Sequence, residues 1–583
     1  MPRSKKGYGR VLPNDDDDSH VGSRAGSRIG SRKKVTAGAP AELEGLQRFP
    51  GMGGGIMDDV KRRRRFCVKD YTTGVRFASK TISAALFMLF ATLFSTVALG
   101  ALVEHETDGR IGLSEYLLMN CLAGIAHSLL GCQPLLVLRP TGPITAITIK
   151  LSKLADQFKL DFNQYLAATG VWIGVLMVLC AALELSRHIK RITPFTHDIF
   201  ACFVCSIYVV DGVRDVLGRF DGRPAHFGEA LLAANLSLLT FGASMWLSGA
   251  RRWRLLPPGA RATIADYAVT IAVVLTTLVS FGPRAVAVER ISLPSDFSPT
   301  CFTVAPGAEC VPEDEAGARQ HARPWQISYD GTTPKLWLLA FVSAVPITFF
   351  FYMDQNISSL LCQLPKYNLA RGNYYHASFL AMGLFNAVGP AFGLPFVTGS
   401  LPHSPQFVRA LTTPSATPSG KPSVAEGRVA PLLMYLGIGV PLLLPGLVRL
   451  MPLAAIDGVL AYVGVEGILE TQLWQRLLLL ATPHSQHPPA HQRLRLASVH
   501  LFSAMQLTLL GLCWAINLSP FGLFVSFLIV ALVPAREHIL PSLFSATELA
   551  VLDQIIAVEA ADDDAAAADD LFDAEELQEV DME

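Results

Sequence analysis

The sequence predicts an all-α polytopic membrane protein with about fourteen transmembrane segments, and three observations support this fold class. The chain has 583 residues, of which 51% are hydrophobic and only 17% are charged, against about 25% charged residues in soluble domains. The apolar residues gather in runs such as 80–103, close to the roughly 20 residues that a helix needs to cross a bilayer. Two further runs, 132–150 and 393–411, are broken by Pro and Gly at corresponding places.

The two ends of the chain differ from its middle in charge and composition. The first 65 residues are rich in Gly, Ser, Arg and Lys and finish with the basic run 61–65, whereas residues 541–583 are rich in Asp, Glu and Ala. We expect 1–65 to be a disordered, basic cytoplasmic arm and 541–583 an acidic cytoplasmic tail, with a transmembrane domain at 66–540. The basic run directly precedes the first span, so we expect it to set the topology rather than to bind nucleic acid.

The apolar runs place the spans and their orientation. The expected spans are 80–103, 113–131, 134–150, 163–186, 195–214, 228–248, 265–283, 333–362, 376–392, 395–411, 428–450, 453–471, 494–514 and 517–534. With the N-terminus in the cytoplasm, the basic loops 187–194, 249–262 and 363–375 lie inside, as the positive-inside rule requires. The mostly acidic loop 104–112 then lies outside. We therefore expect a multi-pass membrane protein with both termini in the cytoplasm.

The third and tenth spans are interrupted in the same way. Residues 132–150 (CQPLLVLRPTGPITAITIK) and 393–411 (GLPFVTGSLPHSPQFVRAL) each hold a short β-like stretch, a Pro/Gly break and a run that is long enough for only half a helix. Each break leaves backbone groups unpaired, and these must face protein or a water-filled cavity because lipid cannot satisfy them. The two segments are seven spans apart, so the second is inverted relative to the first. Such a pair is typical of a transporter's substrate site, although two ordinary Pro kinks are the alternative.

Two half-helices that meet near the midplane create a place for an anion. A helix N-terminus presents free backbone N–H groups and about half a positive charge, so it attracts an anion without a buried Arg or Lys. The expected ligands are Thr141, Gly142, Ile144 and Thr145 from the third span and Thr398, Gly399, Ser400 and Leu401 from the tenth. Borate and bicarbonate both suit this lining of amides and hydroxyls. His403, two residues beyond this turn, is equally compatible with packing.

Asp354 is the most informative single residue, because it lies in the middle of the span 333–362. A charge there costs at least about 2.5–3.5 kcal/mol on insertion scales, and intramembrane carboxylates are functional by default. We expect Asp354 to bind a coupling ion, either a proton or Na⁺. No further carboxylate is obvious nearby, which favours proton coupling or exchange. Gln355 and Ser358 follow on its face or on the next turn, where they line the site or make interhelical hydrogen bonds.

Several motifs resemble the anion-exchanger and bicarbonate-transporter superfamily and occur in the same order. GCQPLLVLRPTGPITA at 131–146 is similar to the third-span motif of that superfamily, and FFFYMDQNISSLLC at 349–362 resembles its eighth span. The resemblance covers about residues 66–535. Further matches are IGLSEYLLMNCLAGIAHSLL at 111–130, TPFTHDIF at 193–200 and MPLAAIDGVLAYVGVEGI at 451–468.

Within the superfamily, the tenth span is most similar to the boron transporters of plants and fungi. Their pattern Pro-x-x-Gly-x-x-Pro-x-Ser-Pro is met by Pro395 or its neighbours, Gly399, Pro402, Ser404 and Pro405. The bicarbonate branch usually carries an Arg where this chain has His403. The third span points the other way, because PTGP at 140–143 is commoner in the bicarbonate branch, and Arg139 stands where a Gly is usual.

The resemblance implies a seven-plus-seven inverted repeat in which a core domain moves against a gate domain. The core would comprise about 80–186 and 333–450, and the gate about 195–283 and 453–534. Members of the superfamily are typically homodimers joined through their gate domains, in the plasma membrane. The implied function is transport of borate by efflux or exchange, with proton coupling as an option and no cofactor. A bicarbonate/chloride exchanger or a Na⁺-coupled bicarbonate carrier is the alternative.

Other classes of function stay open at this point. The same fold would also suit a sulfate or nucleobase carrier, or a membrane anchor or sensor that does not transport, although a dead carrier need not keep Asp354 and two broken spans. An enzyme is not expected, because no nucleophile–base set, phosphate loop or metal-ligand cluster occurs at usable spacing. Cys301 and Cys310 lie in a loop expected to be outside, where a disulfide between them is a candidate.

Overall fold

The helices of the protein follow the apolar runs of its sequence. A computed structural model describes residues 45–220, 226–283, 286–291, 293, 297–300, 302–303, 321–413, 422–483, 486, 494–519 and 521–553. The runs expected to form the core contain α3 (Ala78–Glu106), α4 (Leu113–Leu130), α5 (Gly142–Phe158), α6 (Phe162–Ala182), α11 (Pro334–Leu361), α12 (His376–Val388), α13 (His403–Leu411) and α14 (Val429–Leu443). The runs expected to form the gate contain α7 (Pro194–Gly218), α8 (Phe227–Ser248), α9 (Pro258–Asp266), α10 (Ala268–Val279), α16 (Leu453–Leu469), α17 (Gln472–Leu478), α19 (Leu496–Leu518) and α20 (Val525–His538).

Short elements connect these helices. The 3-10 turns are η1 (Leu185–Arg191), η3 (Gly249–Arg252), η5 (Pro365–Tyr367), η6 (Gly389–Phe392), η7 (Leu479–Ala481) and η9 (Gly522–Phe524), and the short helices are α15 (Pro445–Val448), α21 (Leu540–Leu543) and α22 (Ala546–Leu552). Three two-stranded antiparallel ribbons pair β1 (Leu138–Arg139) with β4 (Thr398–Gly399), β2 (Phe302–Thr303) with β3 (His321–Ala322), and β5 (Thr412–Thr413) with β6 (Ser423–Val424).

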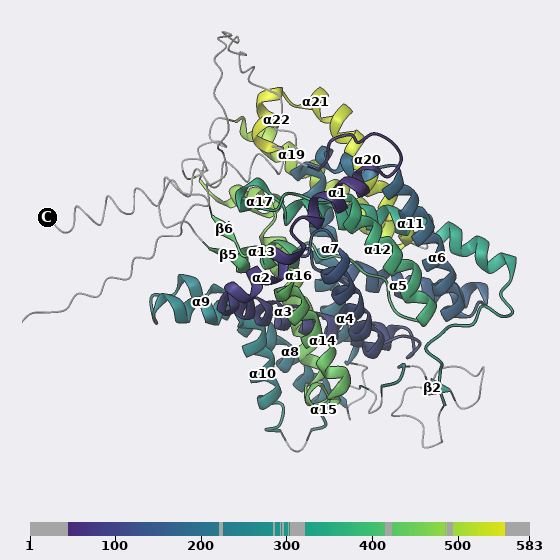
Figure 1. Cartoon of the computed structure of the whole chain (residues 1–583). Coiled ribbons are helices and arrows are strands. Elements are labelled where there is room, and N and C mark those ends of the chain that lie inside the picture. Colours follow the sequence, from purple (N-terminus) through teal and green to yellow (C-terminus); the bar gives the residue numbers. More distant parts are fainter. Residues whose placement is uncertain are drawn as a thin grey trace, which may run out of the picture. The chain divides into compact units, whose positions relative to one another are not determined.

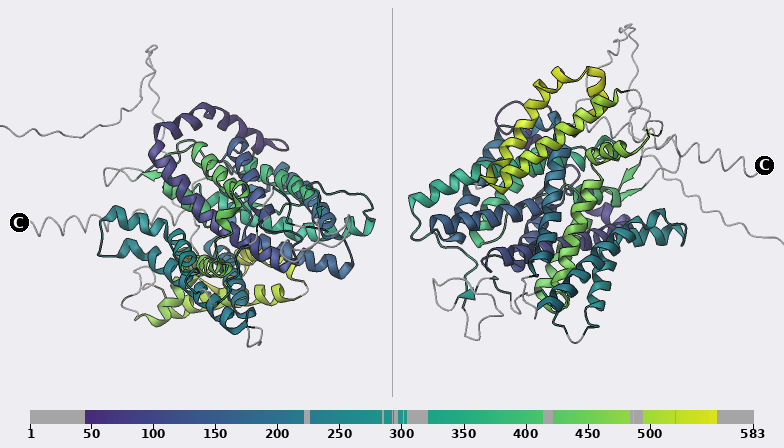
Figure 2. Two further views of the ribbon diagram at one scale, coloured as in Figure 1. Left: turned by 90° about the horizontal axis from the view of Figure 1, so that it is seen from below. Right: turned by 180° about the vertical axis from the view of Figure 1, so that it is seen from behind.

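Helices from the two halves of the chain pack on one another. In the part of the chain from 43 onward, α14 packs on α4, α12 and α11 pack on α6, and α16 packs on α7 and α8. The purple-to-teal helices of the first half and the green-to-yellow helices of the second half are accordingly interleaved in all three views (Figure 1 and Figure 2). A large continuous set of buried apolar side chains fills the space between them. Each half therefore buries part of its apolar surface against the other half, although neighbours within one half, such as α3 and α4 or α8 and α10, also pack together.

Several helices have the length and composition of membrane spans. Among the described residues, six helices qualify, or seven if the pair α9 and α10, bent by 68°, forms one broken span. The six cover Ala78–Glu106, Leu113–Leu130, Phe162–Ala182, Phe227–Arg252, Pro334–Tyr367 and Leu496–Leu518. The remaining apolar runs hold shorter or interrupted helices, so length and composition alone do not establish the expected count of fourteen.

The segment before the first span differs from the expected disordered arm. Helices α1 (Gly54–Arg64) and α2 (Cys67–Arg76) occupy it. The α1 side chain Asp59 is fully buried, and its Oδ2 accepts hydrogen bonds from the backbone N–H groups of Tyr375 (3.2 Å) and Ala377 (3.0 Å) at the start of α12. We expected the basic run to be solvated, but Asp58 and Asp59 pair with Arg62, and Asp70 pairs with Arg63. These carboxylates supply counter-charges that allow the run to fold. Residues 1–44, the rest of the arm, lie outside the described residues, as do 554–583 of the acidic tail.

One buried carboxylate ties α2 to the helix bundle. The Oδ1 atom of Asp70 lies 2.6 Å from both Arg63 Nη2 and Arg371 Nη1, and its Oδ2 lies 3.0 Å from Arg428 Nε. Arg428 also donates to two carbonyl groups in the last turn of α4, at 2.6 and 3.0 Å. Asp70 is fully buried. Its single carboxylate therefore contacts three guanidinium groups that belong to different parts of the chain.

Replacing Asp70 tests this contact. The substitution Asp70→Asn leaves three nearly buried guanidinium groups without their carboxylate, so we expect the free energy of unfolding to fall by roughly 3–5 kcal/mol. The matched control is Asp156→Asn in the exposed Arg110–Asp156 pair, which should change stability by less than about 1 kcal/mol. Thermal unfolding of the detergent-purified variants measures both. Equal losses in the two variants would contradict the assigned role of Asp70.

Candidate functional site

A two-stranded ribbon joins the two interrupted segments inside the helix bundle. Leu138 pairs with Gly399 and Arg139 pairs with Thr398, in antiparallel register. The chain then enters α5 beyond Arg139 and α13 beyond Gly399. Because the strands are antiparallel, these two helices begin at opposite ends of the ribbon. Segments that are about 260 residues apart in sequence thus form one structural unit through backbone hydrogen bonds.

Side chains of α11 hold one edge of the ribbon. The backbone N–H of Gly399 donates to Gln355 Oε1 at 2.7 Å, and Ser358 Oγ donates to the Gly399 carbonyl oxygen at 2.7 Å. A β-carbon at Gly399 would lie 2.8 Å from Gln355 Oε1, so glycine is what lets α11 approach this closely. The N–H of Ser400 donates to the Val137 carbonyl at 2.8 Å. The amides of Gly399 and Ser400, which we expected to face an anion, are therefore engaged in holding the ribbon.

Two further side chains satisfy the neighbouring backbone groups. The Tyr435 hydroxyl on α14 accepts from the N–H of Leu138 at 2.9 Å and donates to the carbonyl of the same residue at 3.1 Å. Asn386 on α12 accepts from the N–H of Val397 at 2.8 Å and donates to its carbonyl at 2.9 Å. A ribbon this short has two unpaired edges, and these side chains replace the strands that would flank it in a wider sheet. Nothing in the sequence distinguished Tyr435 or Asn386 from other polar residues in apolar runs.

Four polar atoms next to the ribbon have no hydrogen-bond partner among the described residues. They are Thr141 Oγ1, Asp354 Oδ2, Gln355 Nε2 and Thr398 Oγ1, and the residues that carry them are at most 6% exposed. The Thr398 side chain lies within interaction range of the Asp354 carboxyl group, although neither Thr398 Oγ1 nor Asp354 Oδ2 completes a hydrogen bond of normal geometry. Buried polar groups are nearly always paired. These four groups are therefore available to form hydrogen bonds with a bound solute.

A tyrosine from α7 lies against the start of α5. The N–H of Gly142 donates to the Tyr208 hydroxyl at 2.5 Å. A β-carbon at Gly142 would lie 2.3 Å from Tyr208 Cζ, so only glycine fits here. Tyr208 is also within electrostatic range of both Arg139 and Asp354. The sequence analysis missed Tyr208, because a tyrosine within an apolar run carries no distinguishing pattern.

The other expected ligands have partners within the protein. Thr145 Oγ1 accepts from the Tyr116 hydroxyl at 3.1 Å, and the Ser400 hydroxyl contacts His403 Nδ1 at 2.8 Å. The Ile144 side chain is fully buried, and Leu401 is partly buried. Asp354, Gln355, Thr141 and Thr398 are thus the expected residues that keep free polar atoms. Cys301 and Cys310 lie outside the described residues.

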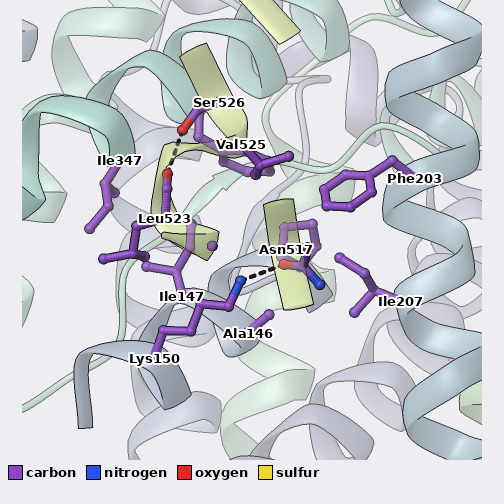
Figure 3. A pocket seen from close by; sticks show the side chains of 13 residues that line it. Ala146, Ile147, Lys150, Phe203, Ile207, Ile347, Asn517, Leu523, Val525 and Ser526 are labelled. Carbon is purple, nitrogen blue, oxygen red and sulfur yellow. Dashed lines mark hydrogen bonds between the residues drawn. The ribbon is translucent and has the colours of Figure 1, made fainter. Parts of the chain in front are cut away.

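A hollow runs beside α5, on the side that faces α7 and α20. It is lined by Pro143, Ala146, Ile147, Lys150, Phe203, Ile207, Ile347, Phe350, Asn517, Gly522, Leu523, Val525 and Ser526. Figure 3 shows Lys150 reaching across it to a hydrogen bond with Asn517 Oδ1. The hollow begins at Pro143, directly after Gly142. It therefore extends from the start of α5 along the boundary between the expected core and gate runs.

The described residues contain no group of three or more His, Cys, Asp or Glu side chains that would suit a metal ion. The four residues of the cluster beside the ribbon carry one carboxyl group, one amide group and two hydroxyls. The guanidinium group of Arg139 belongs to the strand residue opposite Thr398. The chemistry of these groups suits a small solute that both donates and accepts hydrogen bonds.

Comparison with known proteins adds independent evidence on sequence. The model of the family described as "HCO3- transporter integral membrane domain" matches residues 51–229 and 223–557. Anion exchange protein 3 of Mus musculus is 28% identical over 558 residues, which are 88% of this chain and 44% of that protein. Band 3 anion transport protein of Homo sapiens is 26% identical over 566 residues, which are 92% of this chain and 59% of that protein. The chain spans about half the length of these curated relatives.

Among solved structures, the transmembrane domain of a cyanobacterium bicarbonate transporter, BicA, matches with a TM-score of 0.49 and 15% identity over 77% of this chain and 97% of that one. The family match rests instead on the sequence, where the family model covers nearly all of the described residues. The resemblance to the bicarbonate-transporter superfamily is thereby confirmed. The chain belongs to the family defined by the HCO₃⁻ transporter integral membrane domain.

Proposed function

We propose that this chain carries a small inorganic anion across a membrane by alternating access, with the anion held beside the β1–β4 ribbon. The cluster of four unpaired buried atoms carries this proposal. Thr141 and Thr398 offer hydroxyls from the two broken segments, and Asp354 and Gln355 offer polar groups from α11. Leaving such groups unsatisfied costs about 1–3 kcal/mol each. A bound solute that pairs with them recovers that cost.

Bicarbonate is the first candidate for the anion. The family description names HCO₃⁻ transport, and the curated relatives are named as anion exchange proteins. Borate is the second candidate, because the tenth-span pattern with Gly399, Pro402, Ser404 and Pro405 resembles the boron transporters. Exchange against chloride and coupling to Na⁺ or to a proton are compatible with either anion. Asp354 is the proposed binding site of the coupling ion.

The mechanical part of the proposal divides the helices into a core that moves and a gate that supports it. In this scheme the fourteen segments form two inverted halves, and the third and tenth segments are half-helices that carry the anion. Tyr208 on α7 contacts the first residue of α5, so it is the gate residue that closes over the site. The hollow along α5 is the proposed access route. A homodimer in the plasma membrane with cytoplasmic termini completes the scheme.

Asp354→Asn tests the coupling role. Asparagine has nearly the same shape but cannot exchange a proton or hold Na⁺ as a carboxylate does. We therefore expect a folded, inserted protein whose bicarbonate and borate uptake falls at least about tenfold. One charge-assisted hydrogen bond is worth about 1.5–3 kcal/mol, which corresponds to a loss of that size or more. Uptake into proteoliposomes with and without proton and Na⁺ gradients measures the effect. Asp330→Asn, an exposed carboxylate just before the same helix, is the control and should transport normally. Full activity of Asp354→Asn would remove Asp354 from the mechanism.

Gly142→Ala tests the contact between α5 and α7. The added methyl group would lie 2.3 Å from Tyr208 Cζ, and overpacking of this kind costs about 1–3 kcal/mol. We expect slower uptake and a lower melting temperature, and partial recovery of both in Gly142→Ala/Tyr208→Ala. Gly218→Ala, near the end of α7, is the control because nothing lies within 4 Å of its β-carbon. A failure of the second substitution to relieve the first would mean that Tyr208 does not limit the approach of α5.

A further inference from the structure

Arg139 in β1 is a buried cation without a carboxylate partner. Its side chain is only 1% exposed. Its Nε donates to the Pro140 carbonyl at 3.0 Å, and its Nη1 donates to Ser95 Oγ and contacts His403 Nε2 at 3.3 Å. These partners are a carbonyl, a hydroxyl and an imidazole nitrogen, and none of the three is a carboxylate. Within the described residues, no hydrogen bond or ion pair involves the second terminal nitrogen, Nη2.

The other buried arginines differ from Arg139 in their ion pairs. Each contacts a buried carboxylate, as in the pairs Arg63–Asp70, Arg323–Glu115, Arg428–Asp70 and Arg476–Asp198, at 2.6 to 3.1 Å. A buried charge is costly unless it is paired, and at these four places the protein supplies the pair itself. Among the described residues, Arg139 forms no ion pair within 4 Å, so a bound anion can supply the counter-charge there.

The residues around Arg139 indicate where a bound anion would lie. Arg139 lies opposite Thr398 in the ribbon, and the Thr398 and Asp354 side chains carry two of the unpaired atoms. Tyr208 lies within electrostatic range of both Arg139 and Asp354, and its hydroxyl contacts the start of α5. Thr398 and Tyr208 thus connect the guanidinium group with the Asp354 carboxyl group and with the start of α5.

We propose that Arg139 is the fixed positive charge of the substrate site and that it restricts the transported solute to an ionised oxyanion of the bicarbonate type. This inference rests on the proposed function and specifies its substrate class. A guanidinium group presents its N–H groups as a planar fork that matches a carboxylate-like anion. An uncharged solute such as boric acid leaves the buried charge uncompensated and is disfavoured. An ionised oxygen of bicarbonate can accept hydrogen bonds from Nη2, the nitrogen that has no other partner among the described residues.

The contact between Arg139 and His403 allows the charge to be moved without removing it. The Nη1 and Nε2 atoms are 3.3 Å apart, so an arginine at position 403, the first residue of α13, can place its guanidinium near the same point. The test compares Arg139→Gln, Arg139→Lys and the double variant Arg139→Gln/His403→Arg in proteoliposomes. Arg409→Gln is the matched control, because it makes the same chemical change at an exposed position of α13.

We expect Arg139→Gln to lower bicarbonate uptake at least about tenfold, the loss typical of one charge-assisted hydrogen bond. Arg139→Lys keeps the charge but not the fork and should be intermediate. The double variant should recover most of the uptake, which a purely structural role of Arg139 does not predict, and Arg409→Gln should be unchanged. Arg139→Gln that folds and takes up bicarbonate at the wild-type rate would overturn the proposal. If Arg139→Gln fails to fold, the double variant decides: folding with uptake supports the proposal, and folding without uptake overturns it.

Failure of the proposed function itself is distinguishable. It would appear as a wild-type protein that moves neither bicarbonate nor borate. The charge is then tested by binding, through the rise in melting temperature that bicarbonate causes in the detergent-purified protein. A rise in the wild type that is absent from Arg139→Gln supports the assignment to Arg139. An equal rise in both proteins, or none in either, overturns it.

Discussion

The pairing of β1 with β4 is the constraint on which the rest of the site depends. At membrane depth no water is present to satisfy a free N–H or C=O group, so a chain that leaves the helical conformation must find its hydrogen bonds within the protein. The two broken segments solve this problem for each other along two residue pairs. Hydroxyls and amides from the neighbouring helices α11, α12 and α14 then satisfy the outer edges. Removing either segment would leave the backbone N–H and C=O groups of the other without hydrogen-bond partners.

The same arrangement explains why the site has free polar atoms. The Gln355 side chain gives its oxygen to the Gly399 amide, which leaves its nitrogen unpaired. The Thr141 hydroxyl, just before the first turn of α5, has no acceptor nearby, and Asp354 faces Thr398 without a normal hydrogen bond. The other buried arginines, such as Arg63 and Arg428 with Asp70, form ion pairs within the protein. Among the described residues, neither Arg139 nor Asp354 forms one.

Much of this fold could be predicted from the sequence, because hydrophobic length is a local property. The expected span 113–131 is α4 (Leu113–Leu130), and the expected break before residue 142 is where α5 begins. Helix α1 was missed because its basic run resembles a solvated segment, and only its distant contacts with the start of α12 and with Glu184 bury it. The hydrogen bonds of the Gly399 and Ser400 amides could not be predicted for the same reason, because they go to residues remote in sequence.

The sequence by itself determined the class of protein and the place of the two interruptions, and it singled out Asp354 as a candidate, since each follows from composition and from the cost of polar groups in an apolar run. Only the tertiary structure decided which polar groups are used up and which stay free. It showed that Tyr208 contacts Gly142 and that Arg139 forms no ion pair with a carboxylate among the described residues. Neither feature can be predicted from the local sequence pattern. The physical reason is that pairing of buried charges and backbone groups depends on three-dimensional proximity, which joins residues hundreds of positions apart.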